Sequence, residues 1–319
     1  MTNLAKLLDP NLDGNAWEDI CVKCYRFRYE NQHYTPIPAV SGGDAGIEGY
    51  TKTGVVHQCY FPEREYSDNE LYEKQRDKLS ADIKKLLNNG PRFAELGVPQ
   101  IHEWHFNIPE YKDSRILIHA TAKQNEVLNS RAADPEKYSY IASNFQIIVK
   151  TADNFSAEIS RIIRTSAEYN LNLAFEHTPS PDWSKCESKK VENIRRKIKA
   201  VMHVSDDNHP QVTTVVGTYI DYYICGLENM NRLRTRFPEI HADLYRLAQS
   251  YKGEVSLRTN MNTDHSMNRS LFNEILTEFG QKLEKDFSNA FDQASIVEIK
   301  QDMVASWLAD CSMEFWSDI

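Results

Sequence analysis

The sequence contains no run of about 18 apolar residues, the length that a helix needs to cross a lipid bilayer. Its first residues, MTNLAKLLDPNLDG, lack the charged segment, apolar segment and small-residue cleavage site of a secretory signal. There is also no nucleophile elbow, phosphate-binding glycine loop or dinucleotide fingerprint. These absences argue against a membrane partner and indicate a cytoplasmic protein.

Cysteine is sparse, with six residues scattered along the chain. This pattern favours free thiols over a disulfide framework. Cys21 and Cys24 form one CxxC pair, but no second CxxC and no histidine pair stands at the spacing of a zinc site. Because tetrahedral zinc needs four ligands, the spacing argues against a zinc site.

Apolar residues make up 41% of the chain and charged residues 26%, which is typical of a soluble globular protein. A length of 319 residues predicts about two domains. The net charge of -9 argues against a protein coated in nucleic acid. A local basic groove stays compatible with that charge, because affinity depends on the field near the phosphates.

The first half alternates between helical and strand patterns. Residues 14–30 place apolar side chains at helical spacing, with Asn15 as the candidate N-cap. Glu18 lies at the border of the apolar stripe, where a solvated carboxylate and a metal-site role are equally open. Helical patterns recur at 67–88 and 114–130, and strand patterns at 98–109 and 138–149. This order predicts an α/β layer sandwich with a mixed sheet.

Residues 41–63, SGGDAGIEGYTKTGVVHQCYFPE, predict a turn followed by a β-hairpin. If residues 52–54 form a three-residue loop with Gly54 in the left-handed region, Thr51 pairs with Val55.

That register has consequences for the polar side chains. Glu48 then lies opposite Gln58, and Gly46 lies opposite Tyr60. Asp44 shares their face if the strand extends back that far. A two-residue loop would shift the pairing and break this arrangement.

From about residue 151 onward strand patterns are nearly absent. Helical segments are predicted at 154–177, 184–202, 213–226, 238–251, 270–291 and 295–316. The sequence therefore predicts two domains, 1–150 and 151–319, the second mostly α-helical.

Basic side chains are densest between residues 185 and 199. A solvated helix face and a phosphate-binding face are equally open for such a run. The candidates for contacting nucleic acid are Lys74, Lys189, Lys190, Arg195, Arg196 and Lys197.

Metal-dependent phosphodiester cleavage needs hard oxygen ligands for Mg²⁺ or Mn²⁺, a positioned water and positive charge near the phosphate. The side chains of Glu48 and Gln58 offer such oxygens on adjacent strands, and the backbone carbonyl of Cys59 offers another. By strand alternation His57 points away from Gln58, so it is assigned no catalytic role. His102 and His105 also point to opposite faces and cannot share a metal.

The string Gly43-Asp44-Ala45-Gly46-Ile47-Glu48, a short hairpin and then Val56-His57-Gln58-Cys59-Tyr60 resembles a known active-site hairpin. It is similar to that of the PD-(D/E)xK nuclease superfamily, especially the Mrr-like restriction endonucleases. The resemblance covers residues 14–150 and implies a restriction endonuclease-like three-layer core. It does not cover the helical half.

The resemblance implies a role for each matching residue. Glu48 takes the place of the metal-binding aspartate, and Gln58 that of the second ligand. Asp44 matches an acidic residue four positions earlier. Glu18 looks like the carboxylate that the first helix contributes in many members. Tyr60 stands where the family has a lysine.

A lysine on another element can replace the missing ammonium in this superfamily. Lys78 and Lys74, one turn apart on the helix after the second strand of the hairpin, are the candidates. Lys52 is a poorer candidate because it lies at the far end of the hairpin, over about 10 Å from Glu48 at the usual rise per residue.

The resemblance implies a Mg²⁺-dependent deoxyribonuclease acting in prokaryotic defence against phage or plasmids. Its helical domain would sense a signal, form a homo-oligomer or bind partner subunits of a defence complex. The tyrosine at position 60 keeps a second interpretation open, in which a catalytically inactive nuclease fold binds nucleic acid or a partner protein.

Overall fold

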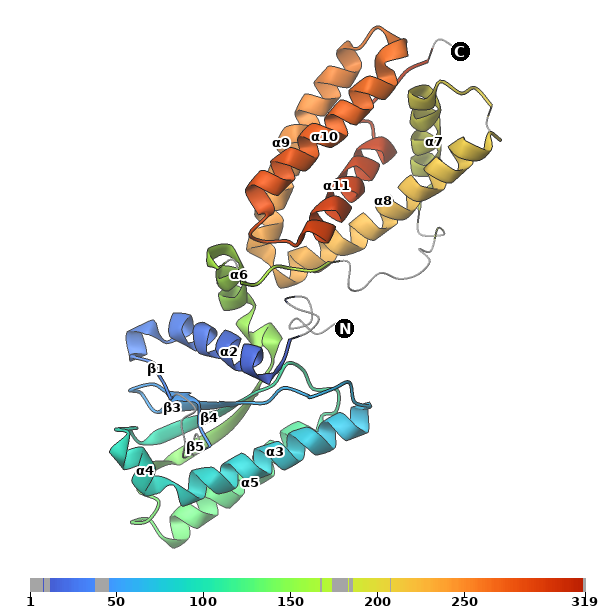
Figure 1. Ribbon diagram of the computed structural model, residues 1–319. Helices are drawn as coiled ribbons and strands as arrows, with labels where there is room; N and C mark the ends of the chain where they lie inside the picture. Colours follow the sequence, from blue (N-terminus) through green and yellow to red (C-terminus); the bar gives the residue numbers. More distant parts are fainter. Residues whose placement is uncertain are drawn as a thin grey trace. The chain divides into compact units, whose positions relative to one another are not determined.

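The structure is a computed structural model that describes residues 8, 12–37, 46–166, 168–173, 183, 186–206 and 208–317 (Figure 1). The chain divides into two compact units, residues 1–162 and 163–319. The first unit contains a β-sheet, and the second is helical. The boundary falls within helix α6 (Ser156–Thr165).

The first unit is built on a five-stranded sheet with the strand order β1-β2-β3-β4-β5. The strands are β1 (Thr35–Pro36), β2 (Gly49–Tyr50), β3 (Val55–Cys59), β4 (Ile101–Asn107) and β5 (Ile141–Lys150). β1, β2 and β3 pair antiparallel, whereas β3, β4 and β5 pair parallel. The predicted α/β architecture with a mixed sheet is therefore confirmed. The apolar run of 145–149 lies in β5, which is an edge strand.

Helices cover both faces of the sheet. Helix α2 (Gly14–Arg28) lies on one face, and α3 (Asp68–Asn88) and α5 (Arg115–Ala133) lie on the other (Figure 1). The short helix α4 (Gly90–Glu95) connects α3 to β4. The main apolar core lies between the sheet and the α3 and α5 layer, with Trp104 and Phe106 of β4 fully buried in it.

The prediction that Asn15 caps the first helix is wrong. Asp13 is the N-cap, and its carboxylate accepts a hydrogen bond of 2.8 Å from the backbone N–H of Ala16. A carboxylate at this position satisfies an unpaired amide and suits the positive end of the helix dipole. Cys21 and Cys24 face the sheet from α2 and are fully buried.

The predicted register of the hairpin is confirmed. Gly54 has a φ of 88°, and the N–H of Thr51 donates to the carbonyl of Val55 at 2.8 Å. Gly49 pairs with His57 and Tyr50 with Val56. This register sets Glu48 opposite Gln58. The pairs do not extend to Gly46 and Tyr60, because β2 begins only at Gly49.

The second unit consists of five long helices among the described residues. They are α7 (Ser188–Met202), α8 (Pro210–Arg236), α9 (Pro238–Met261), α10 (Asn268–Phe287) and α11 (Gln293–Ala309). Helix α11 is buried along most of its length and packs against α7, α8 and α10. In the described part of the chain, no helix is both long enough and apolar enough to span a bilayer.

One predicted helix is shorter than expected. The pattern at 154–177 predicts a continuous helix, but α6 ends at Thr165 and the described residues 168–173 are not helical. Leu171 there forms a β-bridge with Phe291, and both side chains are buried. The apolar residues that continue the helical pattern therefore lie in a non-helical segment. Their spacing does not distinguish the two conformations, because apolar side chains can be buried in either one.

Candidate functional site

Glu48 and Gln58 meet at the base of the hairpin. The side-chain amide of Gln58 donates a hydrogen bond of 2.7 Å to Oε1 of Glu48. Both side chains are buried, with exposed fractions of 6% and 1%. The two residues proposed as metal ligands are therefore adjacent, as the register requires.

The second oxygen of Glu48 faces a histidine and a cysteine. Oε2 lies 4.0 Å from Nδ1 of His57 and makes no hydrogen bond of good geometry with the described residues. Sγ of Cys59 lies 3.8 Å from the same ring nitrogen. One ligand atom from each of Glu48, His57 and Cys59 lies within 4.8 Å of the other two. These three buried side chains form a group that can hold a metal ion.

A network of hydrogen bonds around His57, on the side of the sheet that α2 covers, orients the metal-binding group. The hydroxyl of Tyr34 lies 2.7 Å from Nε2 of His57. The side-chain amide of Asn107 lies 3.3 Å from Nδ1 of His57, while its oxygen accepts a hydrogen bond of 3.2 Å from Tyr25. Tyr25 also contacts Nδ1 of His105 at 2.6 Å. The polar face beneath α2 is thus ordered by buried side chains from three elements.

Helix α2 adds two further residues to the surroundings of Glu48. Cys21 is fully buried, and its thiol lies close enough to that of Cys59 to affect its pKa, which burial raises. Glu18 lies close enough to Glu48 for its negative charge to act on that carboxyl. The resemblance implies that Glu18 of the first helix approaches the hairpin, and the interaction of its charge with Glu48 is consistent with that prediction.

Burial controls the protonation of the site. It raises the pKa of Glu48 to about 7, with Glu18 adding to the shift and Cys59 and Lys78 opposing it. Burial also lowers the pKa of His57 to about 3, and His105 contributes in the same direction. His57 is therefore neutral at physiological pH, which is the form that binds metals.

Lys78 lies on α3 within electrostatic reach of Glu48. Its charge lowers the pKa of Glu48, against the larger effect of burial. Its ammonium nevertheless pairs with Asp82 one turn along α3, at 2.8 Å, and Lys85 lies 3.3 Å from the other oxygen of Asp82. Asp82 is fully buried, and its two ion pairs hold both lysines along α3.

Tyr60 does not take up the position of a charged group. Its partly buried ring stacks on Phe106, with ring centroids 6.5 Å apart and an interplanar angle of 12°. Burial raises the pKa of its phenol to about 12. Asp44 lies outside the described residues, so the predicted sharing of a face with Glu48 has no structural counterpart here.

The basic candidates of α7 separate into two groups. Lys197 is fully buried, and its ammonium pairs with Glu314 at 3.3 Å and donates to the carbonyl of Asp310. Arg196 pairs with Glu314 at 2.6 Å. These two side chains hold the C-terminal segment through interactions inside the helical unit. Lys197 is therefore not available to bind a phosphate. Lys189 is exposed, as is Lys74 on α3 of the first unit.

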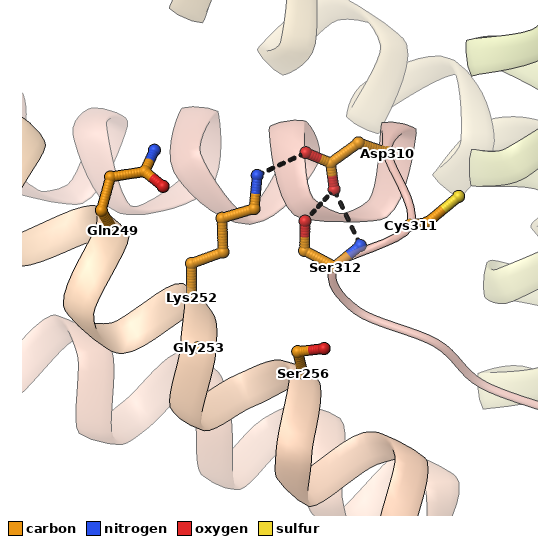
Figure 2. Close-up of a pocket in the computed structure, with 7 residues that line it drawn as sticks. All are labelled: Gln249, Lys252, Gly253, Ser256, Asp310, Cys311 and Ser312. Carbon is orange, nitrogen blue, oxygen red and sulfur yellow. Dashed lines mark hydrogen bonds and ion pairs between the residues drawn. The ribbon is translucent and has the colours of Figure 1, made fainter.

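Two hollows occur on the helical unit. One, of about 510 Å³, is lined by residues of α9 and the segment after α11, and Figure 2 shows Lys252 reaching Asp310 across it at 2.7 Å. Asp310 is further held by Ser312, so the charges at this hollow are paired internally. The other, of about 470 Å³, places Arg195, Lys199 and Trp316 side by side. Neither lining includes a residue of the metal-binding group formed by Glu48, His57 and Cys59.

Sequence reasoning missed His57 and the thiol of Cys59 as candidate ligands. The signal was present, because residues two apart on a strand share one face and His-x-Cys is a plausible pair of ligands. This pair alone did not predict a metal site, because a site needs more than two ligands and the other donors come from other elements. Asp82, Asn107 and Tyr34 had no local signal, since their role depends on neighbours distant in the sequence.

No family model, curated protein or solved structure matches this chain. The functional assignment therefore depends on the geometry of the site and on the motif resemblance.

Proposed function

We propose that the chain is a metal-dependent endonuclease that hydrolyses phosphodiester bonds in DNA. The observation that carries the proposal is the pairing of Glu48 with Gln58 on adjacent antiparallel strands, with a hydrogen bond of 2.7 Å between their side chains. The layered arrangement around the hairpin, with α2 on one face of the sheet and α3 and α5 on the other, supports it, because the resemblance implies a three-layer core. An effector role in defence against foreign DNA fits this activity.

The residues at the hairpin fit a hard divalent cation. Glu48 offers a buried carboxylate whose Oε2 accepts no well-aligned hydrogen bond from the described residues. Gln58 offers its amide oxygen after a flip of the side-chain amide, because the amide nitrogen now faces Glu48. The backbone carbonyl of Cys59 is the third proposed ligand. Carboxylate, amide and carbonyl oxygens are the donors that Mg²⁺ prefers. When bound there, Mg²⁺ would polarise a phosphoryl oxygen and acidify water.

The chain's own side chains would supply the remaining tasks. Glu48 neutralises the cation and fixes its position against the sheet. Glu18, on the covering helix, would orient a water near Glu48; this role is supported by the effect of its charge on the pKa of Glu48. Lys78 would supply positive charge, and Lys74, one turn away on α3 and exposed, would contact the phosphate backbone.

Removal of divalent metal is expected to abolish cleavage. Purified full-length chain would be incubated with supercoiled plasmid and with single-stranded DNA in EDTA, Mg²⁺ or Mn²⁺. We expect nicked or linear products only with added metal, because the proposed ligands act through the ion. A Glu48→Ala preparation purified in parallel reports contaminating nuclease. Equal products with EDTA and with Mg²⁺ would refute metal dependence.

Lys78→Ala is expected to lower the cleavage rate about 100-fold, the typical effect of removing one group that stabilises charge in the transition state. Lys52→Ala is the matched control, because its ammonium donates to the carbonyl of Gly97, away from the site. The measurement is the initial rate of plasmid nicking at saturating Mg²⁺. If Lys52→Ala loses activity and Lys78→Ala does not, the assignment of the replacement lysine is wrong.

A second candidate function follows from Tyr60 and from burial. The phenol stacks in the core and supplies no positive charge, and the two proposed side-chain ligands, Glu48 and Gln58, are less than a tenth exposed. These features favour a nuclease-like fold that binds nucleic acid or a partner protein without cutting. Retained DNA binding with no cleavage under any metal would support this function over the first.

A further inference from the structure

Glu48 lies directly before β2, and its two carboxylate oxygens face different side chains. Oε1 accepts a hydrogen bond from Gln58, whereas Oε2 lies 4.0 Å from Nδ1 of His57, on the face of the sheet that α2 covers. His57 and Cys59 are two residues apart on β3, so both side chains point to this face, opposite to that of Gln58. The ring of His57 stacks on Tyr25 of α2, with centroids 4.0 Å apart. Both β3 side chains are buried, at 0% and 6% exposure.

The separations of the donor atoms suit one small cation. Nδ1 of His57 lies 3.8 Å from Sγ of Cys59 and 4.0 Å from Oε2 of Glu48. In a tetrahedral zinc site with bonds of about 2.0 to 2.3 Å, the ligand atoms lie roughly 3.3 to 3.6 Å apart. The two separations from Nδ1 of His57 exceed this spacing by less than about 1 Å, and the third, between Glu48 and Cys59, lies within 4.8 Å.

Hydrogen bonds direct the correct ring nitrogen of His57 into the group. The NH₂ of the Asn107 side chain lies 3.3 Å from Nδ1 of His57 and requires a lone pair there, which a bound ion would take over from this hydrogen bond. The proton of the neutral ring is then on Nε2, which donates to the hydroxyl of Tyr34 at 2.7 Å. A metal-binding histidine is typically held through its other nitrogen in this way.

Gly49 makes room for that orienting tyrosine. It pairs with His57 across the hairpin, and a Cβ there would lie 2.3 Å from the hydroxyl oxygen of Tyr34. Only a glycine lets the phenol reach over the strand to the imidazole. The arrangement around His57 thus involves β2, β3, β4 and α2 together.

We propose that Glu48, His57 and Cys59 bind a transition-metal ion of the Zn²⁺ class, and that the thiol of Cys21, which lies outside this close group, moves in as the fourth donor. Thiolate and imidazole select such ions over Mg²⁺, which prefers oxygen. A bound cation would also offset the cost of burying a carboxylate beside two thiols. Cys21 is fully buried and its thiol already interacts with that of Cys59. The site does not require the chain to be a nuclease.

The test is metal binding by metal-free, untagged full-length chain. Zn²⁺ affinity is measured by competition with a chromophoric chelator, and Co²⁺ is used as a spectroscopic probe. We expect one tightly bound ion per chain and a thiolate-to-cobalt charge-transfer band. Cys59→Ser and His57→Gln should each weaken binding at least about 100-fold, and Tyr34→Phe about 10-fold, the range for outer residues that hold a ligand. Cys225→Ser, on the helical unit, is the matched control and should bind normally.

Two variants separate this site from the proposed Mg²⁺ site. Cys59→Ser keeps the backbone carbonyl assigned to Mg²⁺ but loses the thiol assigned to Zn²⁺. Gln58→Ala loses an Mg²⁺ ligand and keeps all the Zn²⁺ donors, but it also loses the hydrogen bond that holds Glu48, so its Zn²⁺ affinity should fall by no more than about 10-fold, whether or not the chain cuts DNA. Circular dichroism of the metal-free variants verifies folding. Absence of the charge-transfer band would overturn the proposal. Zn²⁺ affinities equal to that of the wild type in both folded variants, Cys59→Ser and His57→Gln, would also overturn it.

Discussion

Glu48→Ala is expected to lower the rate of plasmid cleavage at least about 1000-fold, equivalent to about 4 kcal/mol of transition-state stabilisation. The other proposed Mg²⁺ ligands, the amide of Gln58 and the carbonyl of Cys59, are neutral. Removal of the carboxylate therefore leaves the ion with little charge neutralisation and no fixed position. The measurement is the initial nicking rate over a range of Mg²⁺ concentrations.

Loss of the fold is not expected to explain that result. Glu48 is buried and its pKa is raised to about 7, so its ionised form opposes folding at neutral pH. The variant should unfold at a temperature equal to or above that of the wild type. Lys52→Ala, at the other end of the same hairpin, should cut within about twofold of the wild-type rate, as expected for a surface change away from the site. A folded Glu48→Ala protein that cuts at the wild-type rate would refute the proposed active site.

Asp302→Asn is expected to stabilise the helical unit by roughly 3 to 5 kcal/mol at pH 8. Asp302 lies on α11 at 2% exposure and accepts a hydrogen bond of 3.0 Å from Asn229 of α8. Burial raises its pKa to about 8 from an ordinary value of 3.8; the hydrogen bond from Asn229 opposes this shift and Glu298 adds to it. An amide keeps the hydrogen bond to Asn229 without the buried charge.

The pH dependence of that difference has a definite sign. A carboxyl with a raised pKa gives its full stability below pH 3.8, where both states are protonated. Between pH 3.8 and about 8 the unfolded carboxyl ionises first, so wild-type stability falls as pH rises. Urea unfolding followed by circular dichroism would measure the difference across this range. Glu284→Gln, on the exposed face of α10, is the control. A difference that stays constant from pH 4 to 8 would contradict the prediction.

Local sequence patterns were sufficient for the secondary structure near the hairpin. Gly54 is left-handed and closes a three-residue loop, so the pairing of Thr51 with Val55 follows from turn geometry. The helical spacing of Cys21 and Cys24 likewise places both on the buried face of α2. Each of these results depends on residues within a few positions of one another.

Sequence patterns were less reliable where the same residue types occur in two different structural settings. Lys197 belongs to a basic run typical of a solvated or phosphate-binding face, yet it is buried against Glu314 near the end of the chain. The apolar residues near Leu171 continue a helical pattern but form a bridge to Phe291. In both cases the partner lies more than a hundred residues away, so no local spacing identifies it.

For this protein, the sequence by itself determined the mixed α/β architecture, the hairpin register and the adjacency of Glu48 and Gln58, because turns and periodicity act over short distances. Only the tertiary structure decided which donors surround Glu48. The packing of α2 on β3 brings Cys21 to Cys59, and the approach of Tyr34 over Gly49 orients His57. Spacing alone argued against zinc, because the four donors of the proposed site come from three separate segments that meet only after the chain has folded.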